Sequence, residues 1–194
     1  MKYYLKTAIF GFVYLIIMDL VALLISYIKS DVWQFVVSVL AIAFYFFVAG
    51  AIYFKEGETA LDLLHNNDNQ RRRMVETGEL VEIKTAAEYK PYKGFIIGAF
   101  ICVPLVILLI LHLIIGLAAD ANGAGIAATF MYFLFYLPYG AFHTGSLVFA
   151  DYFVILYSII IISAGVGIAY LLGARKSQRK YDLIERKHRE IYGD

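Results

Sequence analysis

The sequence predicts an all-α protein, a polytopic bundle of transmembrane helices, and three observations carry this prediction. Hydrophobic residues make up 61% of the 194 residues, and the mean hydropathy of +0.71 is well above that of soluble domains. The apolar runs at 7–28, 32–54, 94–118 and 152–172 are each long enough to cross a bilayer core of roughly 30 Å. Every Lys and Arg lies outside these runs.

The first run begins after a charged N-terminus, as a signal peptide does. It is too long for a signal peptide, contains Asp19 and lacks a small-x-small cleavage site, so we interpret it as a retained span. A tight turn at 29–31 follows, in which Ser30 or Asp31 is a candidate helix N-cap, and Trp33 marks the membrane interface. The second run then returns to the starting side.

Residues 55–93 form the long polar stretch of the chain, with basic and acidic side chains in nearly equal number. The triplet Arg71, Arg72 and Arg73 predicts that this stretch is cytoplasmic. Apolar spacing predicts short helices at 58–65 and 69–77, separated by a turn at 66–69, with Gly78 ending the second. The stretch is either a solvated connector or a surface that docks a partner, with the arginine triplet as the docking residues.

Residues 126–150 decide the span count. The break at 137–140 interrupts this stretch, and the apolar part that precedes or encloses the break is short for a full crossing. Basic residues outnumber acidic ones in the tail at 174–194, so the tail is predicted to be cytoplasmic, and an even number of crossings must follow Lys93. We therefore expect four full spans plus an outer re-entrant or interfacial aromatic segment. Five full spans with an external tail are the alternative.

This topology divides the chain into four parts. They are an N-terminal transmembrane hairpin at 1–54, a cytoplasmic polar loop at 55–93, a C-terminal transmembrane region at 94–173 that includes the segment 126–150, and a basic cytoplasmic tail at 174–194. Pro104 is expected to kink the third span. The patch around Gly165 and Gly167 is expected to serve helix packing or an oligomer contact. The predicted location is the cell membrane.

Asp19 is the most informative single residue, because an ionised side chain near the bilayer centre costs at least a few kcal/mol. It is either a cation, proton or substrate site, or a hydrogen-bonded group that ties spans together through residues such as Tyr14. His112 lies in the third span at a similar depth, so an Asp–His proton relay is a further hypothesis. Asp19, His112 and Tyr14 are the candidate solute or ion pathway.

The predicted outer face supplies a second group of candidates, which are Asp31, Asp120, His143 and Asp151. They are either ligands of a divalent cation, although no metal-binding spacing supports this, or turn and cap residues. Phe130, Tyr136 and Pro138 belong to an aromatic stretch that is either an interfacial belt or a lid over a cavity.

Motifs for catalysis, phosphate binding and dinucleotide binding are absent, and the single cysteine excludes a disulfide framework. We expect no cofactor and no nucleic-acid partner, and the identity of any metal is left unknown. The leading hypothesis is a membrane protein that handles a small solute or cation, as a transporter or a transporter subunit. A membrane scaffold that docks partners, as a homo-oligomer or in a larger complex, is the alternative. An intramembrane enzyme acting on lipid-linked substrates is the third class.

Overall fold

The computed structural model describes residues 2–78, 83, 85–118, 134–135, 138 and 150–192. Side chains are not described at positions 2, 108–109, 111–118, 150–155 and 192. Within these ranges the chain forms helices joined by turns and has no strand, so the all-α prediction is confirmed there.

Helix α1 spans Lys2–Ile25, and helix α2 spans Asp31–Thr77. Ser30 occupies the N-cap of α2, but its side chain makes no capping hydrogen bond. The turn predicted at 66–69 is wrong, because α2 continues through it without a break; the residues there have no glycine or proline to stop a helix. Gly78 ends α2 as predicted, with φ 73° and its N–H donating to the Met74 carbonyl.

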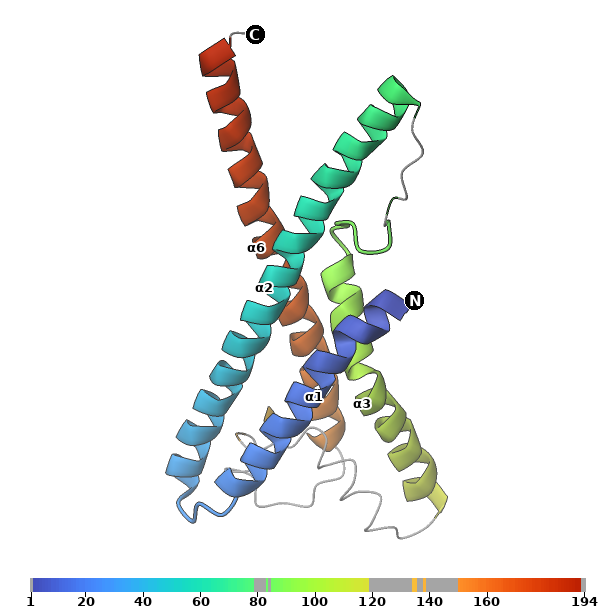
Figure 1. The fold of residues 1–194 in the computed structure, drawn as a ribbon. Helices are drawn as coiled ribbons and strands as arrows, with labels where there is room; N and C mark the ends of the chain where they lie inside the picture. The colour runs from blue at the N-terminus through green and yellow to red at the C-terminus, as the bar shows by residue number, and fades with distance from the viewer. Residues whose placement is uncertain are drawn as a thin grey trace.

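Helix α3 spans Lys93–Ala118 and remains continuous through Pro104, although it changes direction part-way along its length (Figure 1). Helix α6 spans Ala150–Tyr192, so the last apolar run and the tail form one helix. Asp151 therefore lies inside the first turn of α6 and does not precede it as a cap. In the tail, Arg189 donates to Glu185 at 2.8 Å, an i, i+4 pair on exposed helix.

The four helices alternate in direction (Figure 1). The start of α1, the second half of α2, the start of α3 and the second half of α6 all lie at one end of the bundle. Three helices in the described part of the chain, α1, α2 and α6, are long and apolar enough to cross a membrane. α3 contributes a shorter apolar stretch over its described residues, Lys93–Ile107. The coarse prediction of a polytopic helical architecture therefore agrees with the structure.

Helices α2 and α6 cross in an X, and glycines on both helices make the close approach possible (Figure 1). A Cβ atom at Gly57 of α2 would collide with the Tyr170 carbonyl of α6. In the reciprocal position, a Cβ atom at Gly173 would collide with the Phe54 carbonyl of α2. Small residues permit such backbone contact between helices in a membrane.

A second close contact joins α3 to α6. Gly94 and Gly98, four residues apart on α3, face Gly167 and Ser163 of α6, with a Cβ at Gly98 only 2.6 Å from the Ser163 Cα. The small-residue patch predicted around Gly165 and Gly167 is thus a packing surface within the chain. The matching glycine pair on α3 is a small-xxx-small pattern that the sequence analysis did not use.

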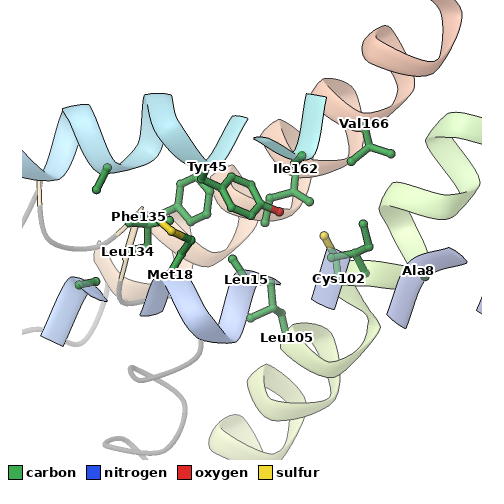
Figure 2. Packing of buried hydrophobic residues seen from close by; sticks show 14 of the residues in the cluster. Ala8, Leu15, Met18, Tyr45, Cys102, Leu105, Leu134, Phe135, Ile162 and Val166 are labelled. Atoms are coloured by element: carbon green, nitrogen blue, oxygen red, sulfur yellow. The ribbon is translucent and has the colours of Figure 1, made fainter. Parts of the chain in front are cut away.

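The apolar core lies between these helices and includes two residues from outside them (Figure 2). Leu134 and Phe135 are 0% and 4% exposed and pack with residues of α1, α2, α3 and α6, among them Met18, Leu15, Tyr45, Ile162 and Leu105. Part of the stretch at 126–150 therefore enters the core instead of covering it from outside.

Candidate functional site

Asp19 of α1 is completely buried in this core. Its Oδ1 accepts a hydrogen bond from the backbone N–H of Leu134 at 3.0 Å. Its Oδ2 has no hydrogen-bond partner among the described residues. A buried carboxyl with one open oxygen is unusual, because buried polar atoms are nearly always satisfied.

Two tyrosines place further unsatisfied hydroxyls in the same region. Tyr14 of α1 and Tyr45 of α2 stack with ring centroids 5.5 Å apart and planes 8° from parallel. Both hydroxyl oxygens are buried, and neither has a partner within the described part of the chain. The Tyr45 ring also meets Phe135 edge to face at 6.0 Å, next to Leu134 (Figure 2).

Tyr14 and Tyr45 stack where α1 meets α2, and Tyr45 interacts electrostatically with Asp19. We call these three residues the Asp19 site. Each can accept a hydrogen bond, and the tyrosines can also donate one. In the described ranges, no Lys or Arg forms an ion pair with Asp19. The open acceptors therefore suit a species that brings a positive charge or a donated hydrogen bond.

Cys102 of α3 lies close to this region but has weak contacts only. Its thiol is 1% exposed, and its Sγ lies 3.8 Å from the Ile159 carbonyl and 4.0 Å from Ser163 Oγ. Neither neighbour is a base that would activate a thiol. The described geometry gives Cys102 a packing role.

The remaining pathway and outer-face candidates are only partly described. The backbones of His112 and Asp151 lie in α3 and α6, but their side chains fall outside the described residues, so the Asp–His relay stays a hypothesis. Pro138 occupies a helical position and is partly buried. Four further candidates lie outside the described residues altogether, namely Asp120, Phe130, Tyr136 and His143. The described residues contain no group of three or more potential metal ligands.

The arginine triplet lies on the second half of α2, and one member holds the following segment in place. Arg71 pairs with Asp68 and with Glu88, each at 2.6 Å, and the hydrogen bond to Asp68 is the main cause of its raised pKa. Buried Asn67 donates to the same Glu88 oxygen at 2.7 Å. Arg72 and Arg73 are exposed. Arg71 thus has a structural role that sequence alone did not reveal.

The second halves of α2 and α6 contact each other just beyond their crossing. Ser177 Oγ donates to Asp62 at 2.5 Å, and the His65 and Tyr181 rings stack at 3.9 Å with planes 3° from parallel. Burial raises the pKa of the Tyr181 hydroxyl, and the Asp62 carboxylate adds to the effect. Toward their C-terminal ends, beyond the crossing, the two helices diverge (Figure 1). We call 66–77 of α2 and 182–192 of α6 the two arms.

Comparison of the chain with protein-family models, with curated proteins and with solved structures found no match. The function must therefore be argued from the residues themselves.

Proposed function

We propose that this chain is a polytopic membrane protein that handles a small solute or ion at the Asp19 site, as a transporter or as a subunit of one. The observation that supports the proposal is the open Oδ2 of a fully buried Asp19, beside two tyrosine hydroxyls without partners in the described ranges. A carboxylate at membrane depth is costly unless a proton or a cation neutralises it. The free-energy cost for the Asp19 carboxylate to bind and then release one positive charge is low only if its surroundings change between the two steps.

The proposed topology has four spans, formed by α1, the apolar half of α2, α3 and the apolar half of α6. The alternating helix directions support this count, because all polar ends then lie on one side (Figure 1). The excess of basic residues in the tail supports a cytoplasmic location for that side. The burial of Leu134 and Phe135 supports a re-entrant segment that reaches Asp19 from the opposite side.

A flux assay tests the proposal. The purified chain is reconstituted into liposomes that contain a pH-sensitive dye, and ion gradients are imposed with protons and with alkali cations in turn. We expect the wild type to carry a flux that Asp19→Asn removes, because the amide keeps an acceptor for the Leu134 N–H but cannot exchange a proton or pair with a cation. Asp182→Asn is the matched control, since Asp182 is exposed on the polar half of α6. Equal flux in both variants would refute the proposal.

A second candidate function is the docking of partners, and the two arms favour it. They project beyond the bundle as helices (Figure 1) and carry large apolar side chains in water, with Val75 87% and Ile191 71% exposed. If this is the function, Leu183→Lys together with Ile184→Lys should lower the molar mass of the purified particle or abolish cross-links to the arm. Asp19→Asn should then have no effect on either measurement.

A further inference from the structure

A cavity of about 460 Å³ lies at the end of the bundle where α1 and α3 begin. Two aromatic residues of α1, Tyr3 and Tyr4, form one wall. The rest of the lining comes from the segment that leads into α3, and consists of Thr85, Ala86, Glu88, Lys90 and Lys93. This site is separate from Asp19 and does not depend on the function proposed for it.

Lys93 is the unusual member of the lining, because it is a lysine with only 1% of its surface exposed. Its Nζ donates to the Ala86 carbonyl at 2.6 Å and to the Glu88 carbonyl. It also faces the rings of Tyr3 at 5.0 Å and Tyr4 at 5.8 Å. These partners are carbonyl dipoles and ring faces, and none of them carries a full negative charge.

The acidic side chains that the structure describes near Lys93 are engaged elsewhere. Oε1 of Glu88 accepts hydrogen bonds from Asn67 and Arg71, and Glu56 accepts one from the Tyr3 hydroxyl. No carboxylate in the described ranges lies within ion-pair distance of Lys93. Burial lowers the pKa of the Lys93 ammonium, and the like charge of Lys90 lowers it further, while Glu88 and Glu56 act in the opposite sense.

We propose that this cavity binds the phosphate group of an anionic lipid, with Lys90 and Lys93 as the cationic partners. An ammonium has three N–H donors, and two of those of Lys93 already point to carbonyls. A phosphate oxygen is the natural acceptor for the third. The cavity lies next to the first residues of α1 and α3, where polar chain gives way to apolar helix, and this is the depth of lipid headgroups. The Tyr3 and Tyr4 rings suit the apolar part of the lipid next to its phosphate.

The test uses the full chain in a neutral detergent. It is titrated with short-chain phosphatidylglycerol, with phosphatidylcholine of the same chain length, and with inorganic phosphate, and lipid retention is measured by native mass spectrometry. We expect phosphatidylglycerol to bind more tightly than phosphatidylcholine, and Lys90→Gln to weaken its binding about fivefold. Lys187→Gln is the control, since it removes the same charge from an exposed site on the arm of α6. Lys93→Gln should abolish the preference for phosphatidylglycerol if the variant folds. If that variant does not fold, the result for Lys90→Gln tests the proposal.

The outcomes separate the two sources of phosphate. Preferential binding of phosphatidylglycerol that depends on Lys90 supports a lipid headgroup. Equally Lys90-dependent binding of inorganic phosphate, with no preference between the lipids, assigns the cavity to a soluble phosphate. The inference is overturned if both lipids bind alike and phosphate does not bind, or if Lys90→Gln behaves as Lys187→Gln does.

Discussion

At the scale of single residues, Asp19 combines a structural contact with a buried oxygen that has no partner among the described residues. Oδ1 accepts a hydrogen bond from the backbone of Leu134, which fixes this residue against α1, while Oδ2 stays open in the described structure. Asp19 could be singled out from its position alone, because a carboxyl in an apolar run needs compensation. Leu134 could not be singled out as the partner, since a backbone N–H has no sequence signature.

Replacing Asp19 by leucine separates these two roles. Asp19→Leu leaves the buried Leu134 N–H without its acceptor, and we expect a loss of about 1–3 kcal/mol in the free energy of unfolding. Asp19→Asn keeps an acceptor and should lose less. Thermal unfolding in matched detergent measures both variants. Equal stability of Asp19→Leu and the wild type would show that the Leu134 contact contributes nothing.

Removal of the Tyr45 hydroxyl is predicted to raise stability, whereas Asp19→Leu is predicted to lower it. Its hydroxyl is buried and lacks a partner in the described part of the chain, and an unsatisfied hydroxyl costs roughly 1–3 kcal/mol. Tyr45→Phe should therefore raise the unfolding temperature, because it removes that cost and keeps the stacking with Tyr14. If the hydroxyl contributes to ion binding, the same variant should lower the flux in liposomes. A loss of stability would mean that the hydroxyl already has a partner.

At the scale of elements, close contact between helix backbones decides how α2 and α6 meet. The reciprocal contacts of Gly57 and Gly173 leave no room for a side chain at the crossing. Gly50, on the same helix, has nothing within 4 Å of an added Cβ. Gly57, at the crossing, and Gly50, which has open space around it, thus form a matched pair of positions on α2.

Gly57→Ala should destabilise the protein by about 1–3 kcal/mol or more, because the helices must move apart to admit the methyl group. Gly50→Ala should be neutral or stabilising by up to about 1 kcal/mol, since alanine favours a helix over glycine. Chemical denaturation in mixed micelles compares them. The crossing would not be as close as described if the two substitutions had the same effect.

The segment before α3 depends on a second matched pair. Asn67 is buried and donates to Glu88, whereas its neighbour Asn66 is exposed. Asn67→Leu should weaken the attachment of 85–92 to α2 and speed amide hydrogen exchange there by about tenfold, the equivalent of one lost buried hydrogen bond. Asn66→Leu should leave the exchange unchanged. Unchanged exchange in both would show that Arg71 alone holds Glu88.

The helical pattern of the apolar runs and the end of α2 at Gly78 were accessible from sequence, but the unbroken continuation of α2 and α6 from their apolar halves into their polar halves was not. The apolar pattern of the second run ends at residue 54. The polar residues that follow were therefore interpreted as a loop with a turn at 66–69. Contacts between the two helices, such as Ser177 with Asp62 and His65 with Tyr181, support them beyond that point. These contacts join residues more than a hundred positions apart, and no local pattern predicts them.

At the scale of the whole molecule, the arrangement in Figure 1 makes a prediction about sidedness. In a Cys102→Ala background, single cysteines at Glu76 on the α2 arm and at Lys187 on the α6 arm should be protected together from an impermeant reagent on intact cells. A cysteine at Lys29, in the turn between α1 and α2, should be labelled. All three positions are exposed. If the cysteines at Lys29 and Lys187 were both labelled while the one at Glu76 stayed protected, the chain would have five crossings and an external tail.

The crossing of α2 and α6 also has a mechanical meaning. Each helix runs unbroken from the apolar core, through the contact at Gly57 and Gly173, into its arm. If both helices stay straight and remain in contact at the crossing, the distance between them on one side of the crossing cannot change without a change on the other side. The distance between the two arms therefore reports the distance between α2 and α6 on the other side of the crossing, around Tyr45.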